Sequence, residues 1–404
     1  MANHDITLVF DFNNLAMRSL FTCAFASGKE SVPIRDFSTS AELGVFIRKL
    51  AIDMSYVMRT VSPNRVIVCC DDRYPWRYKL LADASIGYKG TRHKDETKDW
   101  DAIFKALNEY KKILKKQNII VYEIPNAEAD DLAAFVKKDI FKTAHDDIIY
   151  VSSDKDWLQL VDFDETNKCF CAVMNPIMNA HKKRPLNVSE EFTGWLDSED
   201  SSNSVENIFF INADKSKEQV KNLIMTAGVE VVTIDPNQVL LSKLFCGDQS
   251  DNIPSLYEFY KNGKLSRITT SKMKKIVDNF GLKNGEDFIK AAKTSEFKEY
   301  IESIIKHEID DLNLTDQAER QRLLVELNPE LFPEPVCENY EYMSNNISET
   351  GRIQSGNMKM EKLLEGTQYY DKNYIEKARR SDVFSDIKEL DKFIKPKSVV
   401  NELF

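Results

Sequence analysis

The amino-acid sequence predicts an α/β protein with a mostly parallel central sheet flanked by helices. Short, continuously apolar and β-branched runs, typical of strands buried on both faces, recur in the first half of the chain. They occupy residues 6–10, 65–70, 118–124 and 146–153. Helical patterns fill the intervening segments, at residues 41–61, 100–117 and 129–144. Because strand and helix alternate, we expect parallel strands joined by helical crossovers.

The composition is that of a soluble globular protein with ample material for a core. Of the 404 residues, 42% are hydrophobic and 30% are charged, and no apolar run approaches the length of a membrane span. The start MANHDITLVF lacks the basic region of a secretion signal. The seven cysteines form no CxxC pair and no zinc spacing. We therefore expect no membrane association and a cytoplasmic location, in the host cytoplasm if the chain is phage-encoded.

Acidic residues follow all four predicted strands. In chain order they are Asp11, Asp71 and Asp72, then Glu128, Asp130 and Asp131 in NAEADDLAAF, then Asp154 and Asp156. Ligands of a parallel sheet bind beyond the carboxyl ends of its strands, where these acids should meet. Helix capping from Asn126 and the helix dipole is the alternative explanation for the third group. Because so many like charges repel one another, divalent cations with oxygen ligands are the better explanation.

A further acidic pair, Asp248 and Asp251, lies in GDQSDNIP. Gly247, Asn252 and Pro254 favour a simple turn between helices at this point. A spacing of three would also let both carboxylates face the same way if the segment is helical.

Basic and aromatic residues follow the second acidic block. They are Arg77, Lys79, Tyr88, Lys89 and Arg92, and Lys272, Lys274 and Lys275 lie on a predicted basic helix over 269–281. The net charge of −10 alone argues against nucleic acid, but it averages an acidic site with basic patches. A cationic, aromatic loop above a metal site suits a phosphate backbone and unstacked bases. A solvated surface loop is the alternative.

Six blocks in this order resemble the 5′-nuclease superfamily of flap endonucleases and 5′→3′ exonucleases. They read LVFDFNNL, VCCDDRYPWRYKL, YKGTR, EADDLAA, VSSDKDWLQL and GDQSDNIP. The likeness spans about residues 6–285 and is closest to the T-even phage ribonuclease H branch. It implies metal-dependent hydrolysis of phosphodiesters in branched, nicked or RNA-primed duplex DNA during phage replication. Such an enzyme acts as a 5′→3′ exonuclease or flap endonuclease and removes primers in the manner of ribonuclease H.

The resemblance also implies roles for single residues. Asp11, Asp71, Glu128, Asp130 and Asp154 would hold the metal most directly, and Asp131, Asp156, Asp248 and Asp251 would complete the cluster or a second metal position. Two Mg²⁺ ions are expected, with Mn²⁺ as a substitute. Lys89 would approach the scissile phosphate with Arg92 nearby, while Asp130 and Asp154 take part in catalysis. Arg77 would bind phosphate.

The same resemblance suggests how the chain is divided. Residues 1–235 would form the nuclease core, with an arch at about 85–105 and a surface insertion at about 185–235. Residues 236–290 would form a helix–three-turn–helix element that grips duplex DNA and can hold K⁺. Residues 291–404 would form a helical C-terminal domain whose end, SVVNELF, docks on a sliding clamp. A terminal element packed on its own domain is the alternative for that end. Single-stranded DNA-binding protein is a further expected partner, and the chain is expected to be a monomer.

Three other function classes are less consistent with the sequence. A non-catalytic, structure-specific DNA-binding protein on the same fold would have lost acids, whereas all are present. PIN-type endoribonucleases share the sheet and the acids, but they are usually shorter and lack the GDQSDNIP block. A phosphatase with an aspartyl nucleophile would carry Asp-x-Asp after the first strand, and DFNN does not supply it.

Overall fold

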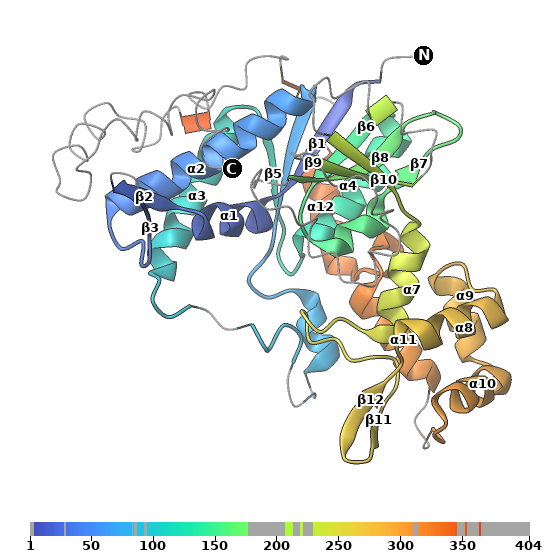
Figure 1. The fold of residues 1–404 in the computed structure, drawn as a ribbon. Coiled ribbons are helices and arrows are strands. Elements are labelled where there is room, and N and C mark those ends of the chain that lie inside the picture. Colours follow the sequence, from blue (N-terminus) through green and yellow to red (C-terminus); the bar gives the residue numbers. More distant parts are fainter. Residues whose placement is uncertain are drawn as a thin grey trace.

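The computed structural model shows an eight-stranded central sheet with the strand order β10-β9-β8-β6-β1-β4-β5, in which β7 pairs with β8 (Figure 1). The structure describes residues 4–27, 30–82, 84, 87–92, 95–176, 207–212, 219–220, 229–309, 314–345, 352–353 and 363–364. The strands are β1 Ile6–Asp11, β4 Arg65–Cys70, β5 Ile120–Glu123, β6 Asp147–Val151, β7 Asp162–Phe163, β8 Phe170–Pro176, β9 Asn207–Ile211 and β10 Val229–Thr233. A separate hairpin joins β2 Ala24–Ser27 to β3 Glu30–Pro33.

The centre of the sheet is parallel, as the sequence predicts. β5, β4, β1, β6 and β8 run in one direction, while β9 is antiparallel to β8 and parallel to β10. All four strands expected from the apolar runs are present within one or two residues of their predicted limits. The loops that follow β1, β4 and β6 therefore leave the same edge of the sheet, and the start of the helix after β5 joins them there.

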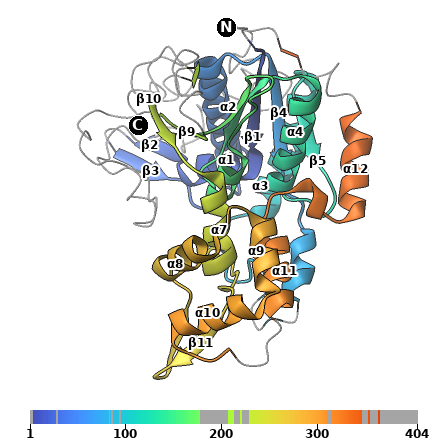
Figure 2. The same ribbon diagram turned by 90° about the vertical axis from the view of Figure 1, so that its right-hand side faces the viewer.

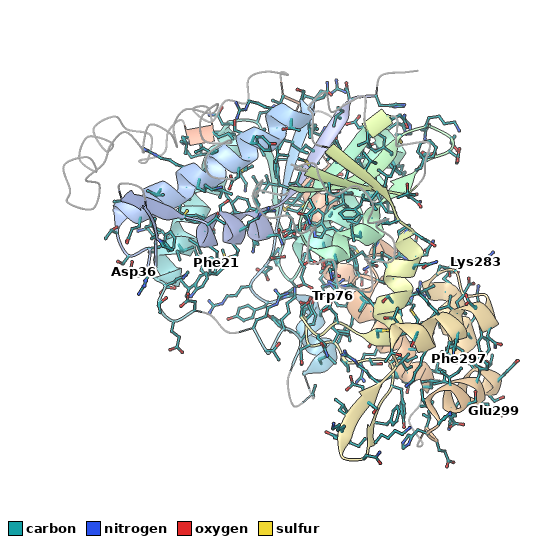
Figure 3. All side chains as sticks on the ribbon, viewed as in Figure 1. Phe21, Asp36, Trp76, Lys283, Phe297 and Glu299 are labelled. Atoms are coloured by element: carbon teal, nitrogen blue, oxygen red, sulfur yellow. The ribbon has the colours of Figure 1, made fainter. Side chains whose placement is uncertain are left out.

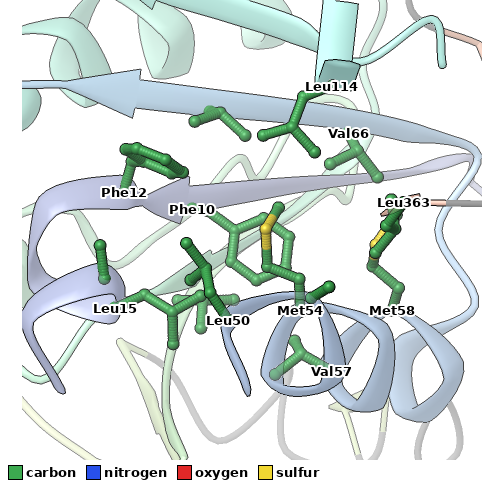
Figure 4. Packing of buried hydrophobic residues seen from close by; sticks show 14 of the residues in the cluster. Phe10, Phe12, Leu15, Leu50, Met54, Val57, Met58, Val66, Leu114 and Leu363 are labelled. Carbon is green, nitrogen blue, oxygen red and sulfur yellow. The ribbon is translucent and has the colours of Figure 1, made fainter. Parts of the chain in front are cut away.

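Helices cover both faces of the sheet. They are α1 Phe12–Phe21, α2 Ser40–Val61, α3 Trp100–Lys116 and α4 Ala129–Thr143. On one face Leu8 and Phe10 of β1 share a core cluster with α1, α2 and α3, and Figure 4 shows Phe10 beside Leu50, Met54 and Val57. The intervening residue, Val9, points to the other face and shares a cluster with α4. This alternation is the period of two that a strand buried on both faces requires.

Two strands lie where we expected a surface insertion. Residues 207–211 and 229–233 form β9 and β10 of the central sheet, and Phe209 and Ile211 are fully buried. The expectation of an insertion over 185–235 is therefore wrong for these two segments. Each is a short apolar run, NIFFI or VEVVT, within a polar stretch, and it gains its strand partners only from the folded sheet. Residues 177–206 lie outside the described part of the chain.

A helical lobe follows the sheet (Figure 2). Its elements are α7 Pro236–Cys246, β11 Glu258–Lys261, β12 Lys264–Arg267, α8 Thr270–Phe280, α9 Gly285–Ala292, α10 Ser295–Ile305 and α11 Leu314–Val325. Apolar residues of these elements form a third core cluster. The predicted helices after Pro236 and over 269–281 are confirmed. The connection between them differs from the expected three turns, because it contains the β11–β12 hairpin.

Beyond α11 the chain returns to the sheet through the 3₁₀ turn η3 (Pro329–Leu331) and the helix α12 (Glu334–Ser344). Gln321 in α11 donates to the Pro254 carbonyl at 2.8 Å, so this segment still holds the lobe. Farther along, Tyr340 stacks on Phe135 of α4 with ring centroids 4.3 Å apart. The segment 314–344, which we call the strap, therefore contacts both the lobe and the sheet.

The predictions made for the C-terminal region are confirmed in part. α10, α11 and α12 give the described residues beyond 290 the helical character that we predicted. The clamp-docking tail SVVNELF lies outside the described residues. Among the described residues, no helix combines the length and the apolar character that crossing a membrane requires.

Candidate active site

Glu128, Asp130 and Asp131 form a compact carboxylate cluster at the start of α4. One oxygen from each lies within 4.8 Å of the others. Glu128 is the N-cap of the helix, and its backbone N–H donates to Asp131 Oδ2 at 3.1 Å in a capping box. The alternative that Asn126 caps the helix is wrong, because Asn126 turns the chain at a φ of 64°. Its N–H donates to Asp72 Oδ2 at 2.8 Å, so Asp72 supports the turn.

Asp11, Asp71 and Asp154 border this cluster. Asp71 Oδ1 accepts from the N–H of Ala129 at 2.8 Å, which attaches the end of β4 to the start of α4. Asp11 Oδ2 accepts from Ser152 Oγ at 2.7 Å, which attaches the end of β1 to the end of β6. Burial, followed by repulsion from Asp71 and Asp154, raises the pKa of Asp11 well above its usual range. The sheet edge thus brings together acids that lie 143 residues apart in sequence (Asp11 to Asp154).

The pKa values of two further carboxyls, Asp71 and Asp130, are raised in the same way. Burial, opposed by Lys89 but reinforced by repulsion from Glu128 and Asp154, raises the pKa of Asp71. Burial and repulsion from Glu128 raise the pKa of Asp130 well above its usual range. Buried carboxylates that destabilise one another's charged forms are the expected signature of a site for cations.

Arg77 lies beneath the cluster and not at the DNA-facing surface that we expected. It is 1% exposed, and its Nη1 lies 2.7 Å from Asp131 Oδ1 and 3.0 Å from Glu128 Oε2. Trp76 donates from Nε1 to Asp131 Oδ2 at 3.0 Å, and Figure 3 places Trp76 at the junction of the sheet and the lobe. The phosphate-binding role expected for Arg77 is therefore wrong, since its guanidinium is enclosed. Arg77 and Trp76 fix Asp131, which lies 0% exposed beneath the other acids.

The loop after β4 delivers Tyr88, Lys89 and Arg92 to the acids. Lys89 Nζ pairs with Glu128 Oε1 and lies 3.7 Å from Asp251 Oδ2, while Arg92 pairs with Asp251 Oδ1. Burial alone would raise the pKa of Glu128, but the charges of Lys89 and Arg77 outweigh it and lower that pKa. The same pairing raises the pKa of Lys89 against the effect of burial.

We expected Tyr88 to present a free ring to bases, but in the structure its ring is buried. It is 3% exposed, packs on Tyr78 with centroids 5.7 Å apart, and donates to Glu128 Oε2 at 3.0 Å. By contrast, Lys79 is exposed on the turn after Trp76. Arg92 is 54% exposed despite its ion pair, so it can reach a ligand at the surface.

Asp156 and Asp248 form a second acidic position around a lysine that the sequence analysis missed. Lys243 of α7 pairs with Asp156 Oδ1, and its Nζ lies 2.6 Å from Asp248 Oδ2. Although burial opposes it, pairing with Lys243 lowers the pKa of Asp248 to about 2. Asp248 and Asp251 therefore face different partners, because Asp251 turns toward Lys89 and Arg92. A lone lysine on a helix carries no sequence signal for such a contact.

The loop 247–254 that carries Asp248 and Asp251 is held by close backbone contacts. Gly247 has a φ of +71°, and a Cβ there would lie 2.4 Å from the carbonyl oxygens of Ile253 and Pro254. The N–H of Lys89 donates to the Asp251 carbonyl at 2.8 Å, which ties this loop to the predicted arch. The basic residues of α8 lie beyond it: Lys274 and Lys275 are exposed, while Lys272 lies over the Phe259 ring.

The sequence of the sheet region matches a family model. Residues 7–193 match the family model of the 5′-3′ exonuclease N-terminal, resolvase-like domain. This match covers a little less than half of the chain and supports the expected resemblance to the 5′-nuclease superfamily over the sheet region. Two DNA polymerases I of Lactococcus lactis are relatives of this part: that of subspecies lactis is 29% identical over 164 residues, and that of subspecies cremoris is 33% identical over 113 residues. These matches cover 40% and 27% of this chain but 17% and 12% of the polymerases, so the chain spans less than a fifth of those relatives.

Two solved structures share their fold with most of the chain. A bacteriophage T5 protein crystallised with metal ions and a T5 flap endonuclease in a pseudo-enzyme–product complex with DNA and metal ions each match with a TM-score of 0.50. Each match covers 85% of this chain and 98% of the T5 chain at 18% identity. At this identity the likeness establishes the fold.

Proposed function

We propose that the chain is a divalent-metal-dependent 5′→3′ exonuclease and flap endonuclease that hydrolyses phosphodiesters in branched, nicked or RNA-primed duplex DNA. Primer removal during phage replication, in the manner of the T-even ribonucleases H, is the proposed biological setting. The observation that carries the proposal is the convergence of acids from β1, β4, α4 and the end of β6 on one sheet edge, together with Lys89.

The donor set fits hard divalent cations, because the candidate ligands are carboxylates whose charges destabilise one another. Asp11, Asp71, Glu128, Asp130 and Asp154 would hold the metal, which we take to be two Mg²⁺ ions with Mn²⁺ as a substitute. When bound, the metal supplies an activated water and neutralises charge on the phosphate, so no side-chain nucleophile is required.

Asp131 would support this site as a positioning residue, because Arg77 and Trp76 already occupy its oxygens. Asp156 and Asp248 would form the second position, with Asp251 between the two groups. At that position the Lys243 ammonium supplies the positive charge, so a cation that binds there must displace it.

Lys89 and Arg92 would bind the scissile phosphate. Both already pair with carboxylates, Lys89 with Glu128 and Arg92 with Asp251. A phosphate oxygen offers each cation a charge-assisted partner equivalent to its present carboxylate. Metal binding at Glu128 would free Lys89 to take that partner. Asp154 is exposed at the end of β6 and would face the substrate with Asp130 beside it.

Further partners rest on the same proposal. Lys274 and Lys275 of α8, with Lys79 and Lys272, would bind the phosphates of the duplex arm, and the connection from α7 to α8 would hold K⁺ through backbone groups. The C-terminal tail would dock on a sliding clamp, and single-stranded DNA-binding protein would be a second partner. The enzyme would work as a monomer in the host cytoplasm.

Cleavage of a 5′-labelled flap duplex, with Mg²⁺ or with EDTA and beside a matched single strand, tests this proposal. We expect Mg²⁺-dependent release of short products near the junction. We also expect Asp154→Asn to lose cleavage and keep DNA binding, and unimpaired turnover in that variant would exclude Asp154 from the metal cluster. Tight binding by the wild type without cutting would favour the non-catalytic DNA-binding alternative. Cutting of single-stranded RNA alone would favour the PIN-type endoribonuclease.

A further inference from the structure

The strap of residues 314–344 contacts several of the segments that carry the acids, although it carries none of the candidate ligands itself. Figure 2 shows its first helix, α11, beside the lobe and its last helix, α12, beside the sheet region. Near its start, Gln321 donates to a carbonyl of the acidic loop 247–254 at 2.8 Å. Farther along, the Val325 carbonyl accepts from Gln159, in the acid-bearing turn after β6, at 2.9 Å. The strap is therefore placed to affect the geometry of the acids.

The third contact of the strap with an acid-bearing segment is made by Phe332. This side chain is 6% exposed, and its ring lies edge-on to Phe135 of α4 with centroids 5.3 Å apart. It also packs against the Trp76 ring and lies 5.8 Å from Cζ of Arg77. Phe332 thus joins α4, whose first turn carries the carboxylate cluster, to the turn that carries Trp76 and Arg77.

The contacts of Phe332 lead directly to Asp131. Trp76 Nε1 donates to one oxygen of Asp131, and Arg77 Nη1 lies 2.7 Å from the other. The remaining guanidinium nitrogens of Arg77, Nε and Nη2, are buried and form no hydrogen bond among the described residues. The orientation of the guanidinium therefore depends on the rings of Trp76 and Phe332 that lie against it.

We propose that the strap positions the metal-binding acids through Phe332, which holds Trp76 and Arg77 against Asp131. Asp131 in turn orients Glu128, because its Oδ2 accepts from the Glu128 backbone N–H at 3.1 Å. Phe332 touches none of the candidate ligands that would hold the metal, so it is a positioning residue. Its place in the chain lies far beyond residues 7–193, which match the family model. This inference rests on the proposed function, since it assumes that the acids bind a divalent cation.

The affinity for Mn²⁺ in the absence of DNA, followed by electron paramagnetic resonance, tests the inference in the variant Phe332→Ala. Residues that support metal ligands from behind change metal affinity by about 10–100-fold, and we expect a loss of about tenfold because Phe332 acts through two further side chains. The Mg²⁺ concentration for half-maximal cleavage of a flap duplex should rise by the same factor. The cleavage rate at saturating Mg²⁺ should stay close to that of the wild type, because excess metal restores the bound state by mass action.

The matched control is Phe46→Ala, which opens a cavity of the same origin on the opposite face of the sheet. Phe46 is fully buried there beside Phe37 and belongs to the core cluster of α1, α2 and α3. This variant should lower stability and leave the Mn²⁺ affinity unchanged. Phe332→Leu fills most of the cavity and should show an intermediate loss of affinity, so it provides the test if Phe332→Ala does not fold.

A double-variant cycle with Trp76→Phe separates positioning from packing. Trp76→Phe keeps an aromatic ring and removes the donor to Asp131, so it should weaken Mn²⁺ binding by itself. If Phe332 acts through Trp76, adding Phe332→Ala should cause little further loss, whereas independent effects would multiply to about a hundredfold and would contradict the inference.

The same measurements distinguish this inference from the proposed function. If the wild type binds Mn²⁺ and cuts the flap, while the Phe332 variants bind Mn²⁺ as tightly as Phe46→Ala does, the strap inference is wrong and the nuclease proposal stands. If the wild type binds no divalent cation, both are wrong.

Discussion

Replacing Arg77 by methionine should show how much of the folding free energy depends on neutralising the buried acids. Nη1 of Arg77 lies 2.7 Å from Asp131 and 3.0 Å from Glu128, and all three side chains are nearly inaccessible. At an effective dielectric constant of about 20, each contact contributes about 6 kcal/mol of attraction. The variant no longer has to desolvate a guanidinium, and Lys89 still neutralises Glu128. We therefore expect a net loss of about 3–5 kcal/mol, as is typical when one partner of a buried ion pair is removed.

Urea denaturation in EDTA at pH 7.5 measures this loss. In the variant the buried carboxyls have higher pKa values in the folded state than in the unfolded state. Its folded state therefore takes up more protons as the pH falls, and the deficit should shrink at pH 5. Millimolar Mg²⁺ should also reduce the deficit, because a bound cation replaces the missing charge. Arg77→Lys keeps one charge and should recover part of the stability.

A deficit below about 1 kcal/mol would refute this reasoning, because a buried cation that neutralises two acids cannot be that weak. A deficit that is the same at pH 7.5 and pH 5, and with or without Mg²⁺, would equally exclude charge as the cause. The loss would then come from packing, for instance from the contact of the guanidinium with the Trp76 ring, 4.7 Å from its centroid.

Three further predictions concern other parts of the molecule. Lys243→Met should let Asp156 and Asp248 bind a cation at least about tenfold more tightly, because the ammonium no longer has to be displaced. Electron paramagnetic resonance of Mn²⁺ measures this binding, and an unchanged Mn²⁺ affinity would contradict the displacement of Lys243. Burial raises the pKa of Asp147 to about 6, so the wild type loses stability as the pH rises from about 4 to 7. Asp147→Asn keeps the acceptor for the Phe170 N–H. Its free energy of unfolding should therefore exceed that of the wild type by about 1–2 kcal/mol at pH 7 and equal it near pH 4. Denaturation at both pH values measures the difference. Deleting SVVNELF should spare cleavage of naked DNA and abolish stimulation by a sliding clamp, and unchanged clamp binding would rule out docking through the tail.

Features encoded locally could be read from the sequence. The four parallel strands and the acids at their ends follow from short apolar runs and from the rule that such strands share one edge. The β11–β12 hairpin also has a local signal, because Asn262-Gly263 between two strand-like runs is a strong hairpin signature.

Roles that depend on tertiary burial could not be read in the same way. In the sequence, Arg77 looks like a surface cation and Tyr88 looks like an exposed aromatic residue. In the structure, Trp76 and Phe332 enclose Arg77. Tyr88 is enclosed by Tyr78, Glu128 and Asp251. Phe332, Glu128 and Asp251 come from distant parts of the chain, so local sequence does not reveal this enclosure. NIFFI and VEVVT have strand-forming residues, but their place in the sheet depends on distant partners, because β9 pairs with β8 and β10 pairs with β9.

The strap of residues 314–344 determines which piece of the chain can fold by itself. Phe332 packs near Trp76 with ring centroids 6.1 Å apart, and Tyr340 donates to Asp139 at 2.9 Å. A fragment cut at residue 193, where the family match ends, would expose these apolar surfaces and would leave β8 as an open edge without β9. Such edges pair with other chains and favour aggregation. The segment that matches the family model is thus shorter than the unit that folds cooperatively. Truncated versions intended for expression should therefore extend through α12.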